Sequence, residues 1–189
     1  MEKERTTIQN LSVCYCLMKR ENSNRAGTVR MSPMTEVLNH VQAFYENKGA
    51  ASCHQAFVYG NQNAFARPFE VYPFGFRAGL DENVEKYDLT ETLVLCYGLL
   101  DDYLPESEKN RETEEMKDVY RLVIISDYPL NSDSEAVDGL MHQMQALKCR
   151  CDFKIVYVDA AGSNQTGSLG KIIDFYGCEE NTMLNECGE

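Results

Sequence analysis

The feature that most constrains the fold is an apolar, β-branched stretch within residues 120–129 that ends on Ser126 and Asp127 at a turn. A continuous apolar stretch of this length is typical of a strand that is buried on both faces of a parallel sheet. A helical pattern follows at residues 133–147, and a second apolar run occupies residues 153–158. Together they predict a β-α-β unit, with Ser126 and Asp127 at the carboxyl end of a strand, where open α/β sheets bind their ligands.

Alternation along this central strand predicts how its side chains divide between the two faces. Val123 and Ile125 are expected on one face, and Leu122 and Ile124 on the other. Both pairs are apolar, so helices should cover both faces of the sheet.

Three more segments carry strand patterns. Residues 11–18 predict a first strand. Residues 55–59 and 64–69 predict two short strands around the turn residues 60–63, which would place an antiparallel strand on the edge of the sheet. Residues 71–78, which are rich in aromatic side chains, are interpreted as a loop.

Helices are indicated where apolar residues recur at helical spacing. Ser32 and Pro33 supply an N-cap and a first-turn proline for one helix, and Asp88 caps the next. Four helices are expected, each with one apolar face. The first face consists of Met34, Val37, Leu38, Val41, Phe44 and Tyr45, and the second of Leu89, Leu93, Cys96, Tyr97, Leu100 and Leu104. The third consists of Val137, Leu140, Met141, Met144 and Leu147, and the last, shorter one of Leu169, Ile172, Ile173 and Tyr176.

The resulting order, β-α-β-β-α-β-α-β-α, predicts the fold class. We expect an α/β fold with three layers, built on a doubly wound and mostly parallel sheet with one antiparallel edge strand, as in Rossmann-like domains. With 189 residues and 43% hydrophobic content, the chain can bury one good core. A single domain over residues 1–189 is therefore expected, with its core at about residues 11–178 and short polar tails.

The net charge of the chain disfavours one class of partner. A net charge of −12 disfavours a nucleic-acid backbone as the main partner, because phosphate binding requires clustered Lys and Arg. Residues 105–118 are rich in carboxylates and are interpreted as a solvated loop, with an acidic docking patch as the alternative. A protein partner or a solvated surface fits this charge better. We expect protein subunits of a larger complex as partners, as the family resemblance described below implies, with no nucleic acid and no small-molecule substrate.

The amino-terminal sequence and the cysteines indicate a reducing compartment. The first apolar stretch spans only about eight residues before Lys19 and Arg20, which predicts neither a signal peptide nor a membrane span. A cytoplasmic and nuclear location without membrane association is expected. The eight cysteines should be reduced, with Cys14, Cys16 and Cys96 buried as small apolar side chains. A zinc site is disfavoured, because the Cys-x-Cys pairs lack the usual ligand spacing.

Motifs for catalysis do not fit this sequence. The glycine-rich residues 162–171 fail the spacing of a phosphate-binding loop, and no nucleophile elbow is present. His40 and His142 fall on expected helices, where a surface role is favoured. Cys53 and His54 are adjacent on a strand and point to opposite faces, so they cannot form a nucleophile and base pair. We expect no enzymatic activity, no catalytic residue and no cofactor.

The order of elements resembles a von Willebrand factor A-type domain. In that family a metal site joins an Asp-x-Ser-x-Ser run after the first strand, a threonine before the middle helix and an aspartate after the central strand. Asp127 matches the aspartate and Thr90 the threonine, whereas Lys19, Glu21 and Ser23 lie where the first run would be. A lysine there would repel a divalent cation, so the resemblance implies a degenerate site without metal.

In the family that this chain resembles, domains without the metal site usually serve as subunits of large assemblies. Residues 87–93, 126–129, 151–158 and 173–177 are similar to the A-type scaffold subunits of the BRISC and breast-cancer-protein A deubiquitinating complexes. That resemblance implies a scaffold that binds a ubiquitin-E2-like partner and stabilises a lysine-63-specific deubiquitinase in DNA repair and cytokine signalling. Members also carry a tail with a Pro/Arg docking motif, which residues 187–189 do not supply, so that contact is expected to be missing or altered.

Three alternatives stay open. A metal-dependent ligand-binding A-type domain would need Asp127, Thr90 and Ser23 to converge. A subunit of another assembly, in transcription, the proteasome or RNA processing, would share the same metal-free fold. A small α/β enzyme would need a polar pocket at the carboxyl ends of the strands.

Overall fold

The structure, a computed structural model, describes residues 7–18, 33–59, 66–72, 89–105, 116–126, 134–148 and 151–159. The strands are β1 Thr7–Met18, β2 Ser52–Tyr59, β3 Ala66–Glu70, β4 Met116–Ser126 and β5 Asp152–Asp159. The helices are α1 Pro33–Glu46, α2 Leu89–Tyr103 and α3 Ser134–Lys148. The last expected helix, with Leu169, Ile172, Ile173 and Tyr176, lies outside the described residues.

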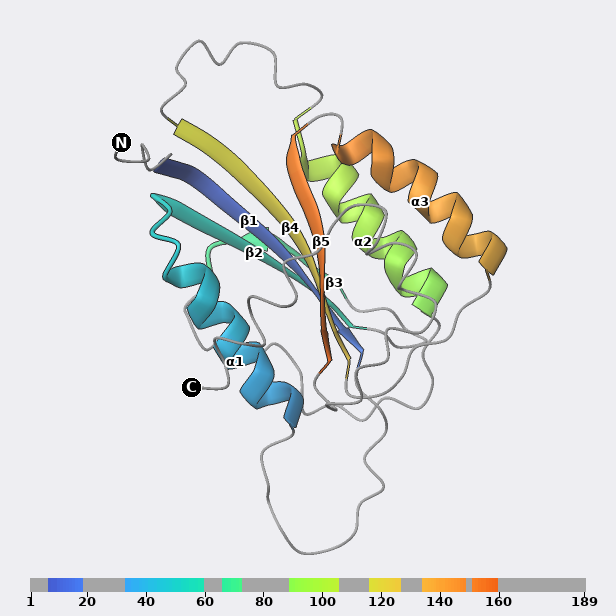
Figure 1. The fold of residues 1–189 in the computed structure, drawn as a ribbon, viewed down its shortest axis with the longest axis horizontal. Coiled ribbons are helices and arrows are strands. Elements are labelled where there is room, and N and C mark those ends of the chain that lie inside the picture. Colours follow the sequence, from blue (N-terminus) through green and yellow to red (C-terminus); the bar gives the residue numbers. More distant parts are fainter. Residues whose placement is uncertain are drawn as a thin grey trace, which may run out of the picture.

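The strands form one sheet in the order β3-β2-β1-β4-β5 (Figure 1). β1 pairs in parallel with β2 and β4, and β4 pairs in parallel with β5. β3 is antiparallel to β2 and lies at the edge of the sheet. The predicted mostly parallel sheet with one antiparallel edge strand is therefore confirmed.

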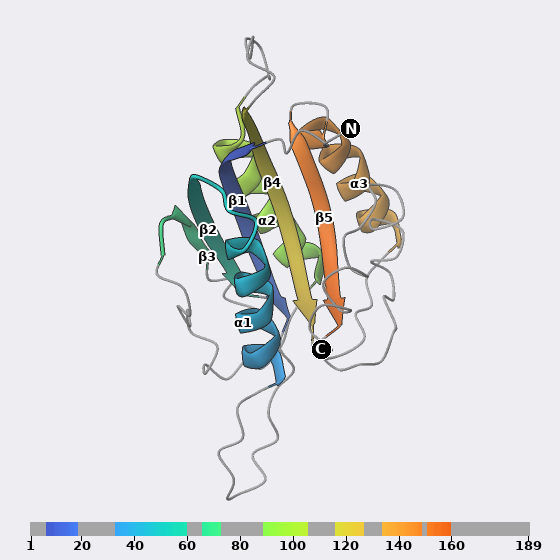
Figure 2. The same cartoon turned by 60° about the vertical axis from the view of Figure 1, so that its left-hand side comes forward.

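Helices cover the sheet on both sides. Figures 1 and 2 show α1 on one face and the pair α2 and α3 on the other, which gives three layers. Val123 and Ile125 belong to the apolar cluster under α1, and Leu122 and Ile124 to the cluster under α2 and α3. The predicted division of β4 between the two faces is confirmed.

Buried thiols contribute to the core under α2. Cys14, Cys16 and Cys96 are fully buried in that cluster, as predicted. Burial raises the pKa of the Cys96 thiol well above its usual value, and contacts with the thiols of Cys14 and Cys16 raise it further. None of the five described cysteines forms a disulfide. These buried thiols contribute apolar packing to the core.

The start of β4 lies in a segment that the sequence predicted to be a loop. Residues 116–118 belong to the strand and not to the expected acidic loop. In addition, Asp118 accepts a 2.8 Å hydrogen bond from Asn10 Nδ2 on β1. These residues pair with β1, and this pairing extends β4 towards its amino end. The acidic composition of the segment gives no sign of a partner strand so far away in the sequence.

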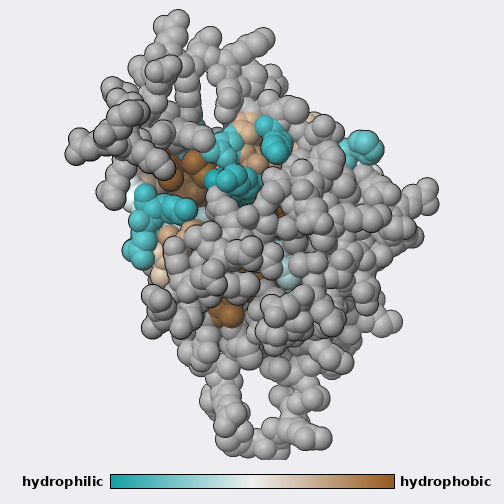
Figure 3. All heavy atoms as spheres, in the orientation of Figure 1, coloured by the Kyte–Doolittle hydropathy of each residue, from teal (hydrophilic) through white to brown (hydrophobic). Residues whose placement is uncertain are grey.

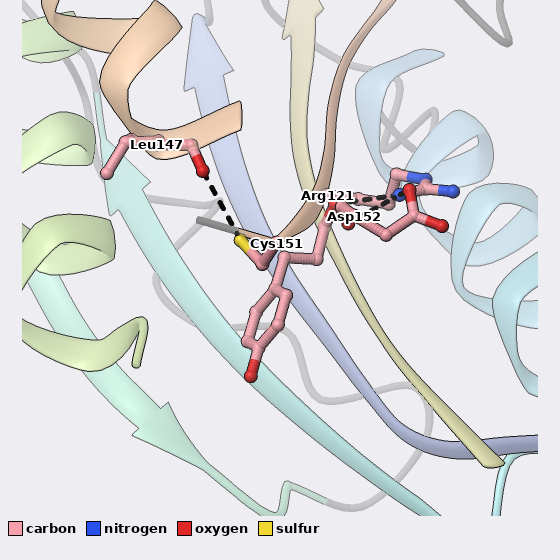
Figure 4. Close-up of polar contacts among 5 residues, drawn as sticks. Arg121, Leu147, Cys151 and Asp152 are labelled. Carbon is pink, nitrogen blue, oxygen red and sulfur yellow. Dashed lines mark hydrogen bonds and ion pairs between the residues drawn. The ribbon is translucent and has the colours of Figure 1, made fainter. Parts of the chain in front are cut away.

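Arg121 is a charged residue inside the apolar stretch, and it is only 6% exposed. Its Nη1 donates to Asp152 Oδ1 at 3.2 Å and to the carbonyl oxygens of Tyr120 and Asp152 at 2.8 and 3.2 Å. Figure 4 shows this ion pair. It also shows a second contact, in which the Cys151 thiol donates a hydrogen bond to the Leu147 carbonyl oxygen at 3.5 Å. The ion pair ties β4 to β5, because a buried guanidinium requires a partner.

Membrane spanning is not indicated in the described part of the chain. None of its helices combines the length and the apolar character that crossing a bilayer requires.

Candidate functional site

The site expected from sequence lies where β1 and β4 end. Met18 pairs in register with Ser126, and both side chains are fully buried. Figures 1 and 2 show α2 beginning at this same end of the sheet, so Thr90, the second residue of α2, lies at this end too. The topology therefore brings together the strand ends and the helix that the family's metal site would use.

The expected metal site falls mostly on residues outside those that the structure describes. Lys19, Glu21, Ser23 and Asp127 lie outside the described residues, and only Thr90 is described. Within the described ranges, no group of three or more His, Cys, Asp or Glu side chains could hold a metal ion. The metal-free interpretation of this end of the sheet stays a prediction.

A second candidate site is a cleft of about 440 Å³ at the opposite end of the sheet. It lies between the end of α1, the turn that follows, the start of β2 and the two residues after β3. In Figure 3 the described surface at the upper left, where α1 ends, carries hydrophilic side chains next to hydrophobic ones. Because β2 starts here, the cleft is at the amino ends of the parallel strands.

Gln55, one of the residues that line the cleft, is half of a buried amide pair. Gln55 of β2 is buried and lines the cleft, and its Oε1 accepts a 3.1 Å hydrogen bond from Nε2 of the buried Gln42 on α1. Its own Nε2 donates to the Tyr72 carbonyl at 3.4 Å. One buried side chain thus connects the helix, the strand and the segment after β3, which fixes the width of the cleft.

The turn after α1 forms one side of the cleft. The amides of Lys48 and Gly49 donate to the carbonyls of Tyr45 and Glu46, both at 3.1 Å, and end the helix. Gly49 adopts a φ of 69°, the left-handed conformation that commonly terminates helices. The turn leaves the side chains of Tyr45 and Glu46 lining the cleft.

The start of β2 is held in place from β1. The Ala51 amide donates to the Ile8 carbonyl at 3.1 Å. The Ser52 hydroxyl donates to Asn10 Oδ1 at 2.5 Å, and Asn10 in turn bonds Asp118 of β4. The cleft therefore rests on three neighbouring strands.

The opposite side of the cleft is the segment after β3. The Tyr72 ring packs edge-on against the Phe57 ring at 5.5 Å, and its hydroxyl donates to the Pro68 carbonyl at 3.2 Å. This anchoring leaves Val71 at the rim, 71% exposed. An exposed valine beside an anchored tyrosine gives the rim an apolar contact surface.

Electrostatics in the cleft centre on Cys53 and Glu46. Burial raises the pKa of the Cys53 thiol, and the nearby Glu46 carboxylate raises it further. Burial likewise raises the pKa of Tyr15, on β1, well above its usual value, with smaller contributions from Tyr45 and Cys53. Among the cleft's described lining residues, Glu46 is the only one with a carboxylate group, and none is a lysine, arginine or histidine.

Cys53 and His54 lie on opposite faces of β2, as predicted. Cys53 packs against the cluster under α1, whereas the His54 ring lies 6.3 Å from the Tyr103 ring of α2. Tyr103 also stacks on Phe69 at 4.0 Å and accepts a 3.3 Å hydrogen bond from Ser12. His40 and His142 are exposed on helices, as expected. The described histidines therefore lie in separate places.

The sequence did not predict the cleft. Its lining comes from segments between residues 45 and 72, which pair through the sheet and through Gln55. No local pattern in these segments indicated that Val71 and Tyr72 return to the end of α1.

Comparison with known proteins gives a likeness of fold. No family model matches the chain, and no curated protein matches it. Among solved structures, the chain is similar to proximal thread matrix protein 1 from the mussel byssus, in crystal form 2, with a TM-score of 0.54 and 8% identity over 97% of this chain and 47% of that one. A second structure of that protein gives a TM-score of 0.50 and 10% identity over 95% and 44%.

The comparison settles the architecture. At such low identity the likeness shows the fold alone, and that fold is von Willebrand A-like, as the order of the elements predicted. The chain spans less than half the length of the structures that it matches.

Proposed function

We propose that this chain is a non-catalytic, von Willebrand A-like binding module that acts as a scaffold or adaptor subunit of a multiprotein complex. The observation that carries the proposal is the state of Cys53, the nucleophilic side chain in the described cleft. Burial and the Glu46 carboxylate both raise its pKa and keep it a thiol at neutral pH. A catalytic cysteine needs the opposite environment, one that favours the thiolate.

The other polar groups of the cleft also support binding. Ser52 and Gln55 are engaged in the hydrogen bonds that hold β1, β2 and the segment after β3 together. Val71 adds exposed apolar area at the rim. A cleft with fixed polar groups and an apolar rim is suited to contact with another protein.

The more specific proposal is a lysine-63-specific deubiquitinase assembly in DNA repair and ubiquitin signalling, in the nucleus and cytoplasm. It rests on the resemblance at residues 87–93, 126–129, 151–158 and 173–177. Its test is whether a deubiquitinase and a ubiquitin-E2-like subunit co-purify with the chain.

A second candidate function is metal-dependent ligand binding at the carboxyl ends of the strands. The register of Met18 with Ser126 and the start of α2 at the same end favour it. Thermal unfolding with and without magnesium measures it. A rise in the unfolding temperature that Thr90→Ala removes supports a metal site, whereas no rise supports the degenerate site.

The scaffold proposal is tested in the native cell. The tagged full chain is purified under native conditions, separated by size and analysed by mass spectrometry with crosslinking. Elution far above the 21.5 kDa of the chain, together with a stoichiometric set of crosslinked subunits, supports the proposal. Elution as an isolated chain contradicts it.

A further inference from the structure

We propose that the cleft between α1, β2 and the segment after β3 binds a lysine or arginine side chain from an extended segment of a partner protein. This inference rests on the proposed adaptor function and assigns a partner chemistry to one site. It concerns the amino end of the sheet, away from the strand ends that the family resemblance marks.

The apolar part of the cleft fits the stem of a long cationic side chain. Val71 is exposed at the rim, and Ala50 and the anchored Tyr72 line the adjoining walls. Lysine and arginine bury their methylene groups against such surfaces while keeping the charged head near water. The volume of about 440 Å³ exceeds that of one side chain, so backbone and neighbouring residues of the partner enter as well.

The negative charges around the cleft favour a positively charged ligand. Glu46 supplies a carboxylate beside the half-buried Cys53 thiol. Glu70 is exposed and pairs in register with Gln55, which places a second carboxylate beside the cleft on the same face of the sheet. The chain as a whole carries a net charge of −12. A cationic partner is attracted, and an anionic one is repelled.

Lys48, in the turn beside the cleft, is engaged in a contact of its own. Lys48 follows α1, and its Nζ lies 4.5 Å from the centroid of the Phe44 ring in a cation–π contact. That contact holds the Lys48 charge over the aromatic ring and leaves Glu46 available to a partner.

The test uses two matched peptides with the isotope-labelled full chain. One probe is acetyl-Ala-Val-Lys-Val-Ala-amide, and the other carries norleucine in place of lysine, which keeps the stem and removes the charge. The lysine peptide should shift the amide signals of residues 50–55 and 71–72 and bind about tenfold more tightly than its norleucine twin. Equal affinities, or shifts confined to other residues, would overturn the proposal.

Variants identify the group that recognises the charge. Glu46→Gln should reduce the preference for lysine over norleucine and weaken the salt dependence of binding, while Glu70 and the net charge of the chain keep a smaller part of both. Asp102→Asn, which removes an exposed carboxylate on α2, should leave both unchanged. An unchanged preference in Glu46→Gln would contradict the assignment.

Cys53 provides an independent readout. Alkylation by iodoacetamide, resolved by peptide mass spectrometry, should slow at Cys53 when the lysine peptide is bound, since the thiol lines the cleft. Unprotected alkylation at saturating peptide would contradict binding in the cleft.

Failure of this inference is distinguishable from failure of the adaptor function. If the native complex forms and Glu46→Gln and Val71→Ser leave it intact, the chain is an adaptor that uses another surface and the cleft assignment is wrong. If the lysine peptide binds the cleft but the chain elutes alone from its native cell, the cleft assignment stands and the adaptor function is wrong.

Discussion

The two ends of the sheet are held together in different ways. Towards the carboxyl ends, the strands are apolar and fully buried, as in Cys14, Cys16, Ile124 and Ile125. Towards the amino ends, side-chain hydrogen bonds join the strands, through Asn10, Ser52 and Asp118 on one side and Arg121 and Asp152 on the other. Apolar burial dominates one half of the sheet, whereas in the other half polar side chains also join the strands to one another.

The largest effect should come from placing a charge in the apolar half. Ile124→Asp buries an unpaired carboxylate at a fully buried position of β4, which costs several kcal/mol against a total stability of roughly 5–15 kcal/mol. The domain should unfold, as circular dichroism and urea titration would show. Ile124→Val, which removes one methylene, should cost only about 1 kcal/mol. A folded Ile124→Asp protein would contradict the buried assignment of this strand.

The next largest effect should come from breaking a polar pair in the amino half. Asp152→Ala leaves the buried Arg121 without its carboxylate and should lower the free energy of unfolding by about 3 kcal/mol. The double variant Arg121→Leu with Asp152→Ala should recover much of that loss, because it removes the buried charge. Urea titrations of the two variants would measure the difference. Equal losses in both would show that the ion pair does not hold β4 to β5.

A smaller effect is expected at the turn that shapes the cleft. Gly49→Ala places a Cβ at a φ of 69°, where it meets no atom within 4 Å but strains the backbone. The free energy of unfolding should fall by about 1 kcal/mol, as thermal denaturation would show. Gly98→Ala on α2 is the matched control, since its Cβ also meets nothing and the helix favours alanine. A loss at Gly98 and none at Gly49 would contradict this view of the turn.

The smallest effect is expected at the carboxyl end itself. Asp127→Ala should leave the fold and the assembly unchanged, because a degenerate site has no metal for the aspartate to bind. The measurements are thermal unfolding and native size separation of the complex. Loss of the complex by a folded Asp127→Ala protein would move the functional site from the amino end to the carboxyl end.

The apolar half of the sheet could be predicted from the sequence, and the polar half could not. The β-branched stretch from Leu122 to Ile125 identifies a buried strand on its own, because apolar periodicity is local. The partners of Asp118 and Arg121 lie on other strands, Asn10 on β1 and Asp152 on β5. Residues 116–118 are therefore interpreted as an acidic loop from their composition alone. The cleft combines residues 45–55 with Val71 and Tyr72, and no local pattern indicates that these two segments meet.

The edge strand β3 has a consequence for how copies of this protein behave at high concentration. An open edge of a sheet presents unpaired backbone groups that can recruit a strand from another molecule. β3 spans only Ala66–Glu70, pairs with β2 through an irregular register, and carries an exposed proline, Pro68, at its centre. Proline has no N–H to donate, so this edge is a poor template for growth into intermolecular sheet, and the protein is protected there against aggregation.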